Sequence, residues 1–258
     1  MTVFDDLQAE CDALDVLVAD LPLELWAAPT PAPGWTIAHQ IAHLAWTDEQ
    51  AAFAARSPEA FSAALAEITD PDAYVDAGAA AGADLPPAEL LEHWRRTRTD
   101  VVQSLREIPP GGRIPWFGPP MAATSMATAR LMETWAHGQD VADTLGVRVP
   151  ATDRIRNVAH IGVRARDYAF FVNGLTPPAT EFLVTLTGPS GAVWTWGPAD
   201  AEQRVTGPAL DFALLATRRR HRDDLAVTAD GKDASRWLDC AQAFAGPAGQ
   251  GRGPGQFG

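Results

Sequence analysis

Apolar residues recur at helical spacing through the first 150 residues of the chain, and each such stretch ends at a proline or glycine. Thr36 stands where it can cap one of these stretches, and Gly146 stands where a helix ends in the left-handed conformation. Between Thr69 and Pro87 the chain is rich in Ala, Gly, Asp and Pro, which predicts a long loop. The predicted helices lie at about 3–20, 36–56, 87–108 and 125–145.

Helices in series favour an up-down bundle, although the long second connection permits a crossover. After Pro150 the pattern changes to helices and strands without a repeating βαβ order, which is typical of an α+β domain. The expected elements there are a helix at 153–173, strands at 181–186 and 192–196, a helix at 208–219, a strand at 225–228 and a helix at 234–244. We therefore predict a helical domain over 1–150, an α+β domain over 151–245 and a flexible, Gly-rich tail over 246–258.

Composition narrows the classes of function. The chain has 258 residues and a net charge of −13, which argues against binding a nucleic-acid backbone. No apolar stretch is long enough to span a membrane, and the first residues lack the features of a signal peptide, so we expect a soluble cytoplasmic protein, monomeric or homodimeric, that acts on a small molecule. Cys11 and Cys240 match neither a disulfide framework nor a zinc motif.

Potential metal ligands lie in two of the predicted helices. Glu133 and His137 are four residues apart and share a helical face, and His43 lies in another helix. Three such ligands leave one coordination position open, as a catalytic metal requires. Two histidines and a carboxylate suit zinc, but also nickel, manganese or iron. The alternatives are a hydrogen-bonded core histidine for His43 and a solvated surface pair for Glu133 and His137.

The segment GWTIAHQIAHL, followed roughly ninety residues later by ETWAHGQDVADTLG, resembles the mycothiol-dependent maleylpyruvate isomerase family within the DinB-like superfamily. The resemblance covers residues 1–150, and the later residues resemble the smaller α+β domain that some members append. It implies a mainly α fold: a DinB-like antiparallel four-helix bundle with a C-terminal α+β domain. It also carries the metal-ligand role onto His43, Glu133 and His137.

His39 departs from the family pattern, because related sequences usually have an acidic residue at this position. Its three interpretations are a fourth metal ligand, a proton-transferring group beside the metal and a surface imidazole without a role. A fourth ligand closes the position that the substrate needs. We therefore predict that His39 is catalytic and does not bind the metal.

Three further residues are candidates for supporting roles. Asp140 lies three residues after His137 and is placed to hold the free imidazole N–H, or to act only as a surface or capping residue. Trp116, in a loop bounded by Pro and Gly, is predicted to line a cofactor pocket, with a core position as the alternative. Arg220, in the basic cluster 218–222, is predicted to bind a carboxylate of the cofactor or substrate, with the charged end of a helix as the alternative.

These features together predict a metal-dependent small-molecule enzyme. The resemblance implies that mycothiol binds the open metal position as a thiolate, which agrees with the lowering of thiol pKa by a divalent cation. Addition of the thiolate to an electrophilic substrate leads either to isomerisation or to S-transfer. The alternatives are a thiol-independent hydrolase, lyase or cyclase that uses His39 as acid or base, and a non-catalytic metal- or small-molecule-binding protein.

Overall fold

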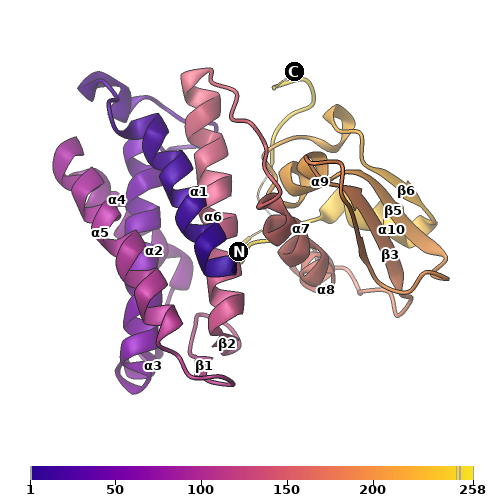
Figure 1. Ribbon diagram of the computed structural model, residues 1–258, viewed down its shortest axis with the longest axis horizontal. Helices are drawn as coiled ribbons and strands as arrows, with labels where there is room; N and C mark the ends of the chain where they lie inside the picture. The colour runs from indigo at the N-terminus through magenta and orange to yellow at the C-terminus, as the bar shows by residue number, and fades with distance from the viewer. Residues whose placement is uncertain (1, 248, 250, 258) are drawn as a thin grey trace. The chain divides into compact units, whose positions relative to one another are not determined.

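A computed structural model describes residues 2–247, 249 and 251–257. The chain divides into two compact units, Met1–Arg148 and Val149–Gly258, whose elements are labelled in Figure 1. The elements of the first unit are, in chain order, α1 (Val3–Val18), the 3-10 helix η1 (Leu23–Ala27), α2 (Ile37–Arg56), α3 (Pro58–Ala66), α4 (Pro71–Ala83), α5 (Pro87–Arg106), β1 (Arg113–Ile114), β2 (Met121–Ala122) and α6 (Ala123–Leu145).

The long helices of the first unit begin and end near their predicted bounds, because their apolar residues recur at helical spacing. Local residues cap several of the ends. Thr2 and Asp5 form a reciprocal capping box at the start of α1, and Gly146 ends α6 with φ 64°. Ser125, the predicted cap of α6, lies inside the helix, three residues after the observed N-cap Ala122. The β2 strand pairs with β1 and leads straight into the helix, so Ala122 takes the N-cap position without a side-chain hydrogen bond.

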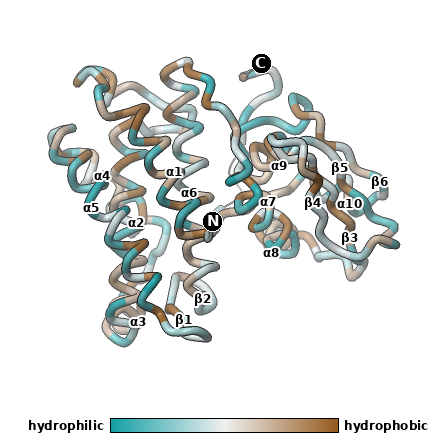
Figure 2. The backbone as a smooth tube through the Cα atoms, viewed as in Figure 1, coloured by the Kyte–Doolittle hydropathy of each residue, from teal (hydrophilic) through white to brown (hydrophobic). Residues whose placement is uncertain are grey.

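Helices α1, α2, α5 and α6 pack against one another and bury their apolar faces (Figures 1 and 2). Two contacts show that α2 and α5 run parallel. Glu49 of α2 contacts His93 of α5, and further along both helices Arg56 contacts Asp100. Helices α3 and α4 lead the chain from the end of α2 back toward the start of α2, where α5 begins. The long second connection is therefore a crossover. The predicted mainly α fold with a C-terminal α+β domain is confirmed.

The prediction of a loop over 69–87 is wrong, because most of this segment forms α4. Asp70 caps the helix by accepting a hydrogen bond from the Ala73 N–H. Gly78 then brings the α4 backbone against the indole of Trp46, where a Cβ atom would lie only 2.6 Å from the ring. Packing of these small residues on α2 therefore overrides their low intrinsic helix propensity.

The second unit is built on a small sheet in the strand order β4-β3-β5-β6, in which β3 and β5 are parallel and the outer pairs are antiparallel. Strand β5 was not predicted, and the helix expected over 153–173 is divided at Ala165. The elements are α7 (Ile155–Arg164), α8 (Arg166–Val172), β3 (Phe182–Thr187), β4 (Val193–Trp196), β5 (Gln203–Pro208), α9 (Ala209–Ala216), η2 (Arg222–Asp224), β6 (Thr228–Asp230) and α10 (Lys232–Cys240).

The core of the second unit lies between the sheet and the helices α9 and α10. Trp237 of α10 contacts Phe182 of β3 and Phe212 of α9 edge-on, with ring centroids 5.7 and 5.6 Å apart. Described residues of the C-terminal tail also contact this unit, since the Gly255 N–H donates to the Asp224 carboxylate. The flexibility of the tail stays a prediction. No helix in the described part of the chain is long and apolar enough to cross a membrane.

Candidate metal centre

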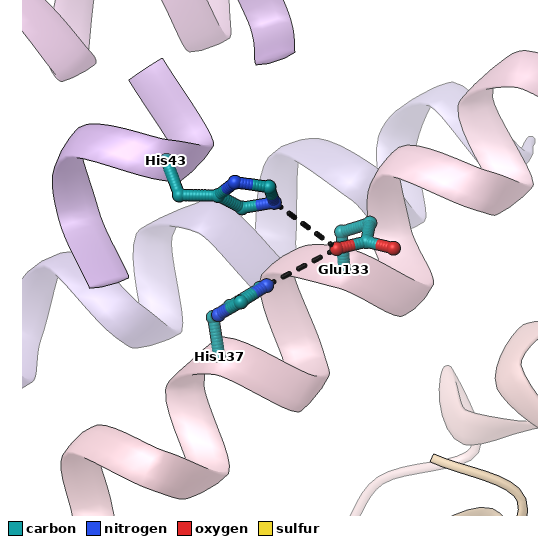
Figure 3. A group of neighbouring side chains, drawn as sticks. All are labelled: His43, Glu133 and His137. Atoms are coloured by element: carbon teal, nitrogen blue, oxygen red, sulfur yellow. Dashed lines mark hydrogen bonds and ion pairs between the residues drawn. The ribbon is translucent and has the colours of Figure 1, made fainter. Parts of the chain in front are cut away.

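The three predicted metal ligands meet between α2 and α6. His43 comes from α2, while Glu133 and His137 come from successive turns of α6 and point toward it (Figure 3). Their nearest ligand atoms all lie within 4.8 Å of one another. The Glu133 Oε2 atom is 3.5 Å from His43 Nε2 and 3.1 Å from His137 Nε2. The four-residue spacing within α6 therefore brings Glu133 and His137 together, and the contact of α6 with α2 adds His43.

These distances suit a shared divalent ion. Bonds of about 2.0–2.2 Å in tetrahedral geometry hold two ligand atoms about 3.3–3.6 Å apart. The two Glu133 distances lie within a few tenths of an ångström of that range. Both histidines present Nε2 to the carboxylate, so the three side chains could hold one ion between them (Figure 3).

The charge state of Glu133 also suits a cation. Burial favours the neutral carboxyl, but hydrogen bonds and positive charge from His137 and His43 outweigh it and hold the pKa of Glu133 well below its usual range. The Glu133 side chain is 21 % exposed, whereas those of His43 and His137 are each 11 % exposed. The cluster is thus largely buried, and Glu133 is its most exposed member.

Gln40 is a member of the site that the sequence analysis missed. Its side-chain oxygen accepts a hydrogen bond from His137 Nδ1, and the residue is fully buried. Asp140, the predicted partner of His137, is also fully buried, and its carbonyl oxygen accepts a hydrogen bond from Thr144. Gln40 precedes His43 by three residues, so both lie on the same face of α2. This spacing was the sequence signal that could have identified Gln40.

Trp35 supplies the aromatic wall of the centre. Its ring stacks on that of His137 at 5.8 Å between centroids, with 18° between the planes, and lies 5.3 Å from the ring of His43. The residue stands just before α2, where the loop folds back so that the Ile37 N–H donates to the Ala28 carbonyl. The sequence did not distinguish it from the other tryptophans, because this position depends on the loop path.

His39 takes part in the cap of α2. Its Nδ1 atom lies 2.8 Å from Thr36 Oγ1 and accepts the Thr36 N–H at 3.4 Å, so the imidazole fills the place of the acidic residue in a capping box. Its ring centroid is 6.2 Å from that of Trp35. His39 therefore lies beside the centre but outside the three-residue cluster.

The two predicted cofactor-binding residues lie in other surroundings. Trp116 stacks on Phe61 at 5.9 Å in an aromatic cluster that includes Phe117 and Trp46. Arg220 belongs to the second unit, where its guanidinium lies 4.6 Å from the centroid of the Phe257 ring. Neither is part of the three-residue cluster.

The sequence of this chain matches two family models and two related proteins. Residues 7–142 match the family model of the mycothiol maleylpyruvate isomerase N-terminal domain, and residues 178–230 match a model described as wyosine base formation. Uncharacterized proteins from two Mycobacterium tuberculosis strains, H37Rv and CDC 1551, are each 60 % identical over 248 residues, which is 96 % of both chains.

Solved structures extend the comparison to the fold. A crystal structure of the mycothiol-dependent maleylpyruvate isomerase aligns with a TM-score of 0.60 at 17 % identity, covering 88 % of this chain and 91 % of that one. The structure of a histidine-to-alanine mutant gives the same TM-score at 18 % identity. Because the first family model matches more than half of the sequence, the chain belongs to the mycothiol maleylpyruvate isomerase N-terminal domain family.

Proposed function

We propose that this chain is a metal-dependent enzyme that uses a thiol, mycothiol, to act on an electrophilic small molecule. The observation that carries the proposal is the convergence of His43, Glu133 and His137 from two helices onto one point. Two histidines and one carboxylate suit zinc and leave a position open for a further ligand. Family membership supports mycothiol as that ligand.

The chemistry of the site follows from its charge and enclosure. A zinc ion held there by His43, Glu133 and His137 would lower the pKa of a coordinated thiol and keep it as a thiolate at neutral pH. The single negative charge of Glu133 would only partly offset the two positive charges of the ion, so the centre would attract an anion. Trp35 covers one side of the histidine rings.

The reaction that fits is addition of the thiolate to an electron-poor double bond. Addition converts that double bond to a single bond, rotation then becomes free, and elimination of the same thiolate restores the double bond in the other geometry. A substrate that retains the thiol after addition gives S-transfer instead. The relative of known structure is named for maleylpyruvate isomerisation, which makes maleylpyruvate the first substrate to test.

We include His39 as a proton donor or acceptor beside the centre. Thr36 engages its Nδ1 atom, which leaves Nε2 as the ring nitrogen available for proton transfer. A group in this position moves a proton to or from the carbon or oxygen that changes charge when thiolate adds.

A thermal-shift titration tests the thiol part of the proposal. The zinc-loaded protein should be stabilised by mycothiol, by about 2.7 kcal/mol at a hundredfold excess over the dissociation constant. The His137→Ala variant, treated identically, should show no such shift. Zinc binding without any response to mycothiol excludes the thiol step and leaves a thiol-independent metal enzyme or a binding protein.

A further inference from the structure

Hydrogen bonds with a defined direction connect the metal centre to the loop before α2. The Trp35 carbonyl can only accept, and the Thr30 hydroxyl donates to it at 2.9 Å. With its proton used there, the Thr30 oxygen accepts from Gln40 Nε2 at 2.8 Å. The Gln40 amide is thereby oriented with its nitrogen toward Thr30 and its oxygen toward His137.

The direction of this chain determines which nitrogen of His137 carries the proton. The Gln40 oxygen accepts from Nδ1, so in the neutral ring Nδ1 is protonated and Nε2 holds a lone pair. That lone pair faces the Glu133 Oε2 atom at 3.1 Å, which is the point where the proposed ion would bind.

We propose that Gln40 and Thr30 are positioning residues that hold the His137 ring in the tautomer that binds metal through Nε2. The inference rests on the proposed metal centre and adds the residues that preorganise it. Gln40 is fully buried and Thr30 half-buried, so solvent does not compete strongly for these bonds. Partners that orient a metal-bound histidine typically contribute about 10–100-fold in metal affinity.

The test is a zinc titration against a chromophoric chelator, with the full chain and several variants. Gln40→Leu should weaken zinc binding about 10–100-fold, because the Gln40 oxygen that accepts from Nδ1 is lost. Gln40→Glu should bind zinc as tightly as the original, because a carboxylate accepts the same proton. Gln242→Leu, at another fully buried glutamine in the second unit, is the matched control and should leave zinc affinity unchanged.

Thr30 provides a second, milder pair of variants that leaves the helical core untouched. Thr30→Val keeps the side-chain shape but loses the hydroxyl, so zinc affinity should fall, whereas Thr30→Ser should restore it. Equal zinc affinity in Gln40→Leu and the original protein overturns the proposal, as does a Gln40→Glu variant that binds as weakly as Gln40→Leu. Absence of zinc binding in the original protein instead overturns the proposed function, so the two failures are distinguishable.

Discussion

Glu133 is the residue on which the electrostatics of the candidate centre depend. Its carboxylate is the shared neighbour of His43 and His137, and the distances to both are those of ligands around one ion or of direct hydrogen bonds. The difference between these two states is a divalent charge at the meeting point. Metal binding and direct hydrogen bonding are therefore alternative arrangements of the same three side chains.

Asp5 provides a prediction on pH dependence. Hydrogen bonds from the Thr2 backbone and from Arg106 lower the pKa of Asp5 to about 2. An aspartate in an unfolded chain has a pKa of about 3.9, so the ionised group stabilises the fold above that pH, and the contribution is lost as the pH falls through 2. Asp5→Asn should reduce the free energy of unfolding at pH 6, and the difference should shrink toward pH 2 in urea titrations. A constant difference at all pH values contradicts the assignment.

His39→Gln separates capping from proton transfer. Glutamine fits the same place in a capping box, so the helical content and the zinc content should remain unchanged. Loss of a proton-transferring imidazole should lower turnover of maleylpyruvate with mycothiol by about 10²-fold or more. Unchanged turnover assigns His39 to the cap of α2 alone, and loss of zinc makes it a ligand.

At the residue scale, the sequence predicted what depends on spacing. Glu133 and His137 are linked by helical periodicity, and the motif around His43 pointed to the third member of the cluster. Trp35 and Gln40 were missed, because their contacts depend on the path of a loop and on the orientation of one amide. Those features are settled by tertiary packing and have no periodic pattern in the sequence.

A buried charged pair joins α2 and α6 near the cluster of His43, Glu133 and His137. Arg130 Nε donates to Asp48 Oδ1 at 2.8 Å, and the two side chains are 3 % and 1 % exposed. Arg130 Nη2 and Asp48 Oδ2 have no hydrogen-bond partner among the described residues. Burial raises the pKa of Asp48 although Arg130 opposes the shift, so desolvation outweighs the attraction.

This balance predicts non-additive effects on stability. Asp48→Asn leaves a buried, uncompensated Arg130 and should cost about 3–5 kcal/mol in zinc-free protein. The double variant Asp48→Leu with Arg130→Met should recover most of that loss, since apolar packing replaces both charges. The exposed pair Arg96 and Glu92 is the control, with an expected coupling of about 0.3–0.5 kcal/mol. Additive losses in urea denaturation contradict this balance.

The sequence pattern failed to predict the secondary structure of segments whose conformation depends on tertiary packing. Strand β5 carries the polar, Gly- and Pro-containing sequence Gln203–Pro208, and it becomes a strand because it pairs with both β3 and β6. Helix α4 forms from residues typical of loops, because their small size lets them approach Trp46. In contrast, the long amphipathic helices were predicted correctly, since periodicity and caps point to the same structure.

At the scale of the whole molecule, each unit contains one buried thiol. Burial raises the pKa of Cys11 in the first unit to about 12 and that of Cys240 in the second unit to about 11. Neither thiol should react with an alkylating reagent near pH 8 until its unit opens. Zinc should raise the denaturant concentration needed to label Cys11 more than that for Cys240, because the proposed ligands all lie in the first unit. Labelling is measured by mass spectrometry of the labelled peptides. If zinc raises the denaturant concentration for both cysteines equally, the prediction is contradicted.

The central claim is that His43, Glu133 and His137 bind one divalent ion in each chain. Elemental analysis combined with calorimetric zinc titration of the purified protein and its His137→Ala variant tests this claim most directly. We expect one zinc per chain, and at least tenfold weaker binding in the variant with its helical content retained. Full zinc occupancy and unchanged affinity in His137→Ala contradict the assignment of the centre.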